Sequence, residues 1–350
     1  MFKIIGSADP KYLAATDLLV GDMSNINYEF LLFDRPIVLL ANDWVKRNFP
    51  DIGPKTDLEN LISTIEKSFR NPNEFEGSRN FWRKRTISIE RNSASHRYID
   101  IILKKCGIVN PEFIFIWGDA VRKTNLEPLV NEVISRGLHC SFIKKKREVT
   151  YNNKNNIIIV AAHYIDLWPD VPGFKVHIDH DLKGIATANI EYAIFEYKKD
   201  NYFPHIDLHI TAGEAGAIRT KLVLGPLANR IVIGGYPKGD DLMRLNNSKN
   251  KKKVYQELEF EENLPLITYA PAGQIDFMKP GGSLNNDVIR EFEKLSSLDK
   301  YNVLVKVKYN KTVQDSIKQI LKKTNIHRRK IIDDGSTWNL IFNQIVNNIE

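Results

Sequence analysis

The chain has 350 residues, of which 43% are hydrophobic and 27% charged, and its formal net charge is +7. This composition is typical of a globular chain with room for two domains, and it argues against a disordered protein. No apolar run approaches the roughly 18 residues of a membrane span, and the amino terminus lacks the features of a signal peptide. We therefore expect a cytoplasmic protein.

Basic residues cluster at 144–147 and 249–253. Such clusters are typical of contact with an anionic membrane or a polyanionic substrate, and equally of solvated loops. No aromatic interleaving or known binding motif accompanies the charge, so we expect no nucleic-acid partner. The cysteines, Cys106 and Cys140, lack metal-ligand spacing, which favours a reducing compartment and argues against a zinc site.

The first informative stretch is residues 17–40, which reads as strand, corner, helix and strand. Leu18–Val20 is a short apolar run, 21–25 is a polar corner, and Pro36 opens a second apolar run after an amphipathic segment. A corner at the carboxyl end of a parallel strand is where open α/β sheets bind ligands and where a helix N-terminus attracts phosphate. On spacing alone, however, Ser24 or Asn25 is better interpreted as a helix cap.

The rest of the chain continues the alternation of strands and helices that is typical of an α/β fold. The pattern predicts helices over 58–69, 127–136, 287–295 and 313–322, and more than one helix within 81–105. It predicts strands over 112–116, 139–143, 157–162, 174–178, 206–211, 230–233, 266–270, 302–307 and 330–332. A new β-α-β unit opens at residue 112, so we expect a domain boundary near 106–111. The Lys-rich segment 249–253 reads as a linker.

Several of these segments resemble the CDP-glycerol glycerophosphotransferase family of teichoic-acid and capsule polymerases. Residues 22–36 resemble the family's "D-x-S-S/G" segment, which holds the donor's phosphates, although Asn25 replaces the second small residue. Residues 93–100 resemble its "A-S-x-R" end, 235–237 its "G-Y-P" turn, and 269–273 its "Y-A-P-T-W" segment. The resemblance implies an α/β, GT-B-like fold with two Rossmann-like domains whose parallel sheets face a central cleft.

The matching segments stand in an unusual order. Residues 1–108 resemble the closing half of the nucleotide-binding domain, 112–238 the acceptor-side domain, and 254–350 the opening half of the nucleotide-binding domain. Faint self-similarity between 3–5 and 330–332 accompanies this order. A circular permutation and a window cut from tandem copies both explain it. Because unpaired sheet edges are liabilities, we expect 1–108 to pair with 254–350 in one molecule.

The resemblance also implies which residues do the chemistry. His180 corresponds to the family's "H-G" corner and would be the base that takes the acceptor's proton, although Asp181 replaces the glycine. A surface histidine beside two acids is the competing interpretation. Residues expected to bind the donor's nucleotide and phosphates are Asp22, Ser24, Asn25, Ala272, Gly273, Lys306 and Lys308, and those expected on the acceptor side or as supports are Asp181, Lys183, Gly235 and Tyr236. Lys308 stands where the family has a second histidine.

These expectations define a transferase that moves glycerol phosphate, or a related polyol phosphate, from a CDP-linked donor to a polyol-phosphate or glycan acceptor in cell-wall or capsule synthesis. It needs no cofactor, and the acids near Asp22, Asp179 and Asp181 do not form a metal-ligand cluster. The partners would be a nucleotide-linked donor, a polyanionic polymer and the inner face of an anionic membrane. A GT-B glycosyltransferase, a UDP-sugar epimerase and a degenerate non-catalytic binding member or fragment remain the alternatives.

Overall fold

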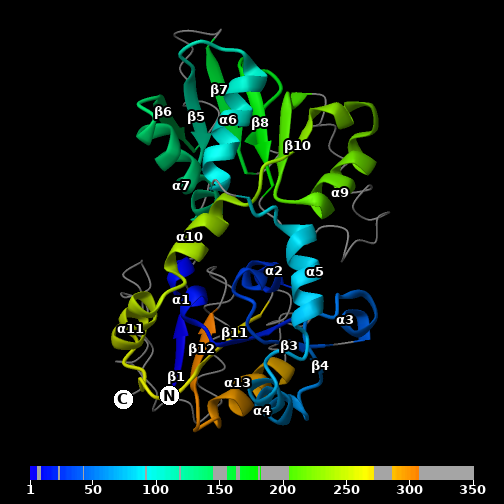
Figure 1. The fold of residues 1–350 in the computed structure, drawn as a ribbon, viewed down its shortest axis with the longest axis vertical. Coiled ribbons are helices and arrows are strands. Elements are labelled where there is room, and N and C mark those ends of the chain that lie inside the picture. Colours follow the sequence, from blue (N-terminus) through cyan, green and yellow to red (C-terminus); the bar gives the residue numbers. More distant parts are fainter. Residues whose placement is uncertain are drawn as a thin grey trace. The chain divides into compact units, whose positions relative to one another are not determined.

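The computed structural model describes residues 1–5, 9–22, 24–41, 43–90, 93–117, 120–144, 156–162, 166–179, 182, 205–271 and 286–306. The chain divides into two compact units, one formed by Met1–Asn80 with Leu245–Glu350 and the other by Phe81–Arg244. Within the described residues each unit contains a six-stranded parallel sheet with helices (Figure 1). The chain therefore has the predicted α/β fold with two Rossmann-like domains.

The first sheet combines strands from both ends of the sequence. Its strands are β1 (Phe2–Ile5), β2 (Leu18–Gly21), β3 (Ile37–Leu40), β4 (Lys55–Thr56), β11 (Leu266–Ala270) and β12 (Asn302–Lys306). Their order is β1-β12-β11-β2-β3-β4, so β1 and β2 each pair with a strand more than 200 residues away. Figure 1 shows β1, from the start of the chain, beside β12. If the strands β11, β12, β1, β2, β3 and β4 are numbered 1 to 6 in that sequence, the sheet has the doubly wound order 3-2-1-4-5-6.

Burial explains why these short runs form central strands. All five residues of β11 and all four of β2 are buried. Continuous apolar runs of this length are typical of parallel strands that are covered on both faces. One core cluster joins β1, β11 and β12 to helices from both parts of the unit, through Tyr12, Val254, Tyr255, Leu258 and neighbouring residues.

The helices of this unit are mostly short. They are α1 (Pro10–Ala15), α2 (Ile26–Phe30), α3 (Asp43–Asn48), α4 (Leu61–Arg70), α11 (Ser248–Glu257) and α13 (Asn286–Ser296), with a 3-10 turn η1 (Leu31–Phe33). Asp9 caps α1 by accepting a hydrogen bond from the Lys11 backbone N–H at 2.9 Å, and Pro10 occupies the first helical position. Pro lacks an N–H and has a helical φ, so it suits this position.

The prediction of a linker at 249–253 is wrong, because this segment lies in helix α11. The Asn247 side chain caps the helix by accepting from the Asn250 N–H at 2.9 Å. Val254, Tyr255 and Leu258 recur at helical spacing and are buried. That apolar spacing, rather than the lysine content, determines the structure of the segment.

The second sheet is built from a continuous part of the sequence. Its strands are β5 (Glu112–Ile116), β6 (His139–Ile143), β7 (Ile157–Ala161), β8 (Phe174–Ile178), β9 (Leu208–Thr211) and β10 (Ile231–Ile233), in the order β10-β9-β8-β7-β5-β6. The chain therefore reverses direction across the sheet between β5 and β7. Its helices are α6 (Ala94–Cys106), α7 (Ala120–Ser135), α9 (Glu214–Leu224) and η6 (Gly225–Arg230), while α5 (Glu76–Thr86) and α10 (Pro237–Leu245) contain the unit boundaries.

Helix α7 begins earlier than the predicted start at Glu127. Proline favours the first turn of a helix and is unusual further inside one. In the structure Pro128 lies inside α7, which begins at Ala120.

Among the described residues, no helix is both long and apolar enough to cross a bilayer.

Candidate functional site

The polar corner at residues 22–25 follows β2 directly, at the carboxyl edge of the first sheet. Asp22 Oδ1 accepts a hydrogen bond from the Ser24 N–H at 2.8 Å, which closes a tight turn. The Asn27 side-chain amide then donates to the carbonyl oxygens of Asp22 and Ser24, at 2.7 and 3.0 Å. The corner is thus held by side chains on both sides of it.

Asn27 also explains why residue 21 is glycine. The Asn27 side chain is fully buried, and a Cβ atom added to Gly21 would lie 1.9 Å from Asn27 Oδ1. Any larger residue at 21 would displace Asn27 and with it both hydrogen bonds to the corner. Asn27 was not among the predicted site residues, although an amide side chain between the apolar residues Ile26 and Tyr28 is a visible signal for such a role.

The interpretation of Ser24 or Asn25 as a helix cap is wrong. Asn25 occupies the N-cap position of α2, but its φ of −58° and ψ of −27° are helical and its side chain makes no capping hydrogen bond. Capping requires a non-helical N-cap whose side chain accepts from the first turn. The Ser24 hydroxyl makes no hydrogen bond with another described residue, and α2 has only five residues. A phosphate at this corner would therefore meet loop groups rather than the dipole of a long helix.

Neighbouring strand ends carry the other residues predicted to bind the donor. Ala270, the last residue of β11, lies opposite Gly21, and Lys306 ends β12 on the other side of β11. Ala272 and Gly273 follow β11, and Lys308 follows β12, but these three residues lie outside the described part of the chain.

The strand order of the first sheet favours its carboxyl edge as a ligand-binding position. The strand sequence reverses direction between β11 and β2, because the chain proceeds from β11 to β12 on one side and from β2 to β3 on the other. In open α/β sheets a crevice forms at the carboxyl ends of the strands at such a reversal. The predicted donor residues Asp22, Ser24 and Asn25 stand beside it.

In the second unit, the predicted base His180 lies outside the described residues, as do Asp181 and Lys183. The preceding residue, Asp179, is buried with 4% of its surface exposed. Its carboxylate lies against the first turn of α9, since a Cβ on Gly216 would be 2.8 Å from Asp179 Oδ2. A negative charge is stabilised at that end of a helix. Asp179 thus fixes the end of the segment that leads into His180.

A buried polar row lies on one face of β8 and β9. Val176 and Ile178 pack into the core on the face that α6 and α7 cover, so strand alternation directs His177 to the other face. There His177 Nδ1 and His209 Nδ1 are 3.0 Å apart, and both rings are almost fully buried. One ring must donate and the other accept, so they hold different tautomers or share a proton. Alternating polar residues in both strands were the missed sequence signal.

The "G-Y-P" turn contacts helix α6, which carries the "A-S-x-R" segment. Gly235 has a φ of +98°, and an added Cβ would lie 2.1 Å from the Arg97 guanidinium. Arg97 donates to the Gly234 carbonyl at 3.0 Å, and the Tyr98 hydroxyl donates to the Gly235 carbonyl at 3.0 Å. Tyr236 beside them is buried. Gly235 and Tyr236 therefore belong to a packed structural contact within the second unit.

A carboxylate completes this contact. Asp240 accepts hydrogen bonds from the backbone N–H groups of Ala94 and Ser95, both at 2.9 Å, and from the Ser95 hydroxyl at 2.7 Å. It thereby satisfies donors in the first turn of α6 that have no intrahelical partner. Burial raises the pKa of the Tyr98 hydroxyl well above 10, and the negative charges of Asp179 and Asp240 add to this effect. Tyr98 stays a neutral donor at physiological pH.

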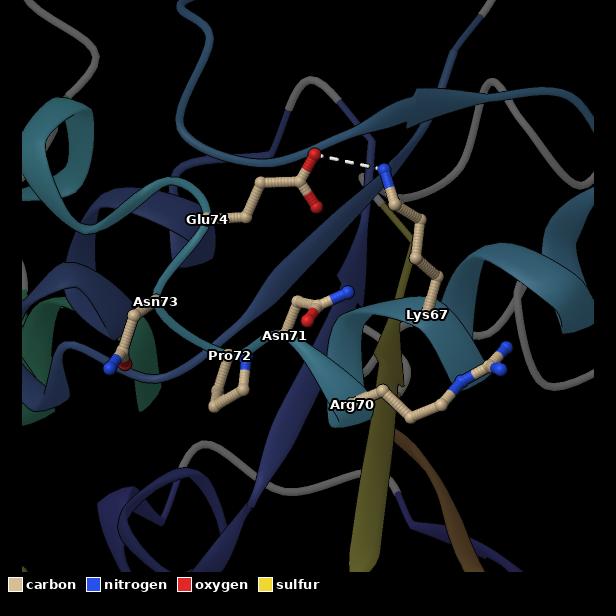
Figure 2. A pocket seen from close by; sticks show the side chains of 6 residues that line it. All are labelled: Lys67, Arg70, Asn71, Pro72, Asn73 and Glu74. Carbon is tan, nitrogen blue, oxygen red and sulfur yellow. Dashed lines mark hydrogen bonds and ion pairs between the residues drawn. The ribbon is translucent and has the colours of Figure 1, made fainter.

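A surface hollow of about 540 Å³ lies beside the end of α4 (Figure 2). Figure 2 shows the ion pair of 2.9 Å between Lys67 and Glu74 across it. Phe69 stacks on Tyr301 with ring centroids 5.1 Å apart, and Tyr301 immediately precedes β12. This hollow therefore lies at the amino edge of the sheet, opposite the edge that carries the 22–25 corner.

Within the described ranges, no group of three or more His, Cys, Asp or Glu side chains is arranged to hold a metal ion. Cys106 and Cys140 are unpaired thiols that are each half-buried.

Comparison with known proteins gives one family. No curated protein and no solved structure matches the chain. The family model that matches covers the 22–25 corner and most of α6. Its members are transferases, and the match supports a glycerophosphotransferase-type function. Residues 8–104 of this chain match the CDP-glycerol:poly(glycerophosphate) glycerophosphotransferase family.

Proposed function

We propose that this protein transfers glycerol phosphate, or a related polyol phosphate, from a CDP-linked donor to a polyol-phosphate or glycan acceptor in cell-wall or capsule synthesis. The observation that carries the proposal is the family match over residues 8–104, which contains the 22–25 corner. That corner stands at the carboxyl edge of a parallel sheet, beside the reversal of strand order. Both features are typical of a nucleotide-binding edge.

The reaction forms a bond from an acceptor oxygen to the phosphorus that carries the glycerol, and it breaks the bond from that phosphorus to CMP. The departing phosphate needs fixed donors and positive charge. Ser24, Asn25 and the segments after β11 and β12 would supply these, with Lys306 and Lys308 as the cations. Asp22 would contribute to this site by holding the turn, because its carboxylate accepts the Ser24 N–H.

His180 would take the proton of the acceptor hydroxyl. Its support is the resemblance of residues 176–184 to the family's corner, and the buried Asp179 that fixes the preceding strand end. A histidine suits this role because its usual pKa lies near neutral pH. Lys308 would act only by charge, because a lysine at neutral pH has no free lone pair. Asp181 and Lys183 would support the acceptor side.

We also propose that the chain is a permuted member of this family, in which the strands of 1–108 and 254–350 form one nucleotide-binding sheet and 112–238 is the acceptor-side domain. The strand order supports this, because it becomes 3-2-1-4-5-6 when the count starts at β11. Helix α6, which belongs to 1–108, packs on the sheet of the acceptor-side domain.

Exposed Lys249, Lys252 and Lys253 on α11 support a further proposal, contact with an anionic membrane at its cytoplasmic face. Lys251 is less available, since it pairs with Asp17 at 2.6 Å.

The decisive experiment measures CMP release from CDP-glycerol and CDP-ribitol in the presence of a polyol-phosphate acceptor. His180→Ala is expected to abolish release, and Ser24→Ala to raise the KM for the donor. His96→Ala is the matched control, because His96 is a half-exposed histidine in an ion-pair network and should leave release unchanged. No CMP release from either donor by the wild-type protein would refute the proposal.

The alternatives give different results in the same samples. A glycosyltransferase or epimerase would bind UDP-linked donors in preference to CDP-linked ones. A non-catalytic member that binds only polymer would show no nucleotide-induced rise in melting temperature, because a ligand stabilises a protein only by binding its folded state. Titration of both nucleotide classes against the melting temperature therefore separates all three functions.

A further inference from the structure

A partly exposed aromatic pair lies at the carboxyl edge of the second sheet. Trp117 directly follows β5, and its backbone N–H donates to the Ile143 carbonyl of β6 at 2.8 Å. Phe142 on β6 is 47% exposed, and its ring lies edge-on to the Trp117 ring with centroids 4.5 Å apart. A partly exposed indole held by a strand end and a second ring is a rigid apolar surface.

A cation lies over the same indole. Lys123 of α7 is exposed, and its Nζ is 5.4 Å from the centroid of the Trp117 ring. Lys144 directly follows β6 at the same edge of the sheet. An anion bound by Lys123 would therefore lie next to the ring, so that one ligand unit would meet both positive charge and apolar surface.

The position in the sheet is also one where α/β folds bind ligands. The second sheet reverses its strand sequence between β5 and β7, and Trp117 stands at the carboxyl end of β5. Ligand crevices form at such reversals. The family match ends at residue 104, so nothing in it assigns a role to Trp117, Phe142 or Lys123.

We propose that Trp117, Phe142 and Lys123 form a subsite for one unit of a polyol-phosphate chain, with the polyol carbons on the indole and the phosphate on Lys123. The identification of this chain as the acceptor rests on the proposed function. Polyol phosphate fits better than nucleic acid, because the two rings are nearly perpendicular, at 83°, and offer no parallel platform for successive bases.

The test measures binding of a fluorescently labelled poly(glycerol phosphate) oligomer to the full chain without donor. Trp117→Ala is expected to weaken binding about tenfold, because it removes the apolar surface on which the polyol carbons would be buried. Lys123→Gln is expected to weaken it and to lower the salt dependence by about one ion. Lys105→Gln is the matched control, an exposed lysine in the last turn of α6, and should bind like wild type.

Trp117→Phe guards against misfolding, because it keeps an aromatic ring in the packing and should retain most of the affinity. Equal binding by wild type and by Trp117→Ala, or equal effects of Lys123→Gln and Lys105→Gln, would overturn the subsite. Tighter binding of a single-stranded oligonucleotide, or equally tight binding of inorganic polyphosphate, would also overturn it. The subsite stands without the proposed function if Trp117-dependent oligomer binding persists in a protein that releases no CMP.

Discussion

Replacing Asp240 by alanine should loosen helix α6 by a measurable amount. The Asp240 carboxylate accepts three hydrogen bonds, from the N–H groups of Ala94 and Ser95 and from the Ser95 hydroxyl. Ordinary N-cap replacements cost about 1–2 kcal/mol. Here Ala94 and Ser95 are only 4% and 5% exposed, so water replaces the carboxylate poorly. We therefore expect a loss of about 3 kcal/mol for Asp240→Ala.

Asp240→Asn keeps one acceptor oxygen and should cost about half as much. The matched control is Asp241→Ala on the same helix, because Asp241 pairs with the exposed Arg244 in a surface ion pair worth about 0.5 kcal/mol or less. Since the chain has two units, a single unfolding midpoint mixes their stabilities. Native-state hydrogen exchange of the α6 amides measures the local free energy directly. A loss for Asp240→Ala within about 0.5 kcal/mol of that for Asp241→Ala would refute the reasoning.

Three further outcomes are expected. Gly21→Ala should abolish the melting-temperature rise caused by CDP-glycerol, because its Cβ would lie 1.9 Å from Asn27 Oδ1; an unchanged rise would contradict the role of Asn27. His209→Leu removes a buried hydrogen-bond partner of His177 and should cost about 2 kcal/mol in the exchange of the β8 amides. Burial raises the pKa of the Tyr98 hydroxyl above its ordinary value of about 10 in the folded state. The protonated hydroxyl therefore contributes fully to stability below about pH 10, and this contribution falls as the pH rises further. Tyr98→Phe should flatten this loss of stability at alkaline pH, as measured by urea titration.

Local sequence patterns were enough to predict the β2-α2-β3 segment. The apolar runs that became β2 and β3 are bounded by a polar corner and by Pro36, and both boundaries hold in the structure. Such runs are informative because central parallel strands must be apolar on both faces. The parallel α/β class followed from the repetition of this pattern along the chain.

Long-range contacts could not be predicted in the same way. The hydrogen bonds that tie Asp240 to α6 join residues about 145 positions apart, and no local pattern marks them. The pairing of His177 with His209 depends on the register between β8 and β9. For Asn25 the residue type favoured a cap, but its helical backbone turns the side chain away from that role. In each case tertiary structure, rather than propensity, decides what the side chain does.

The pairing of β2 with β11 has a consequence for how the chain folds. Asp17 accepts the Leu266 N–H across 249 positions, whereas every strand of the second sheet lies between residues 112 and 233. Closing a long loop costs entropy before the contact repays it, so sheets with high contact order form late. During synthesis the second unit should therefore reach its native structure first, while β1 to β4 wait for β11 and β12 to be translated. Until then their apolar edges need protection, which makes chaperone dependence an expected property of this protein.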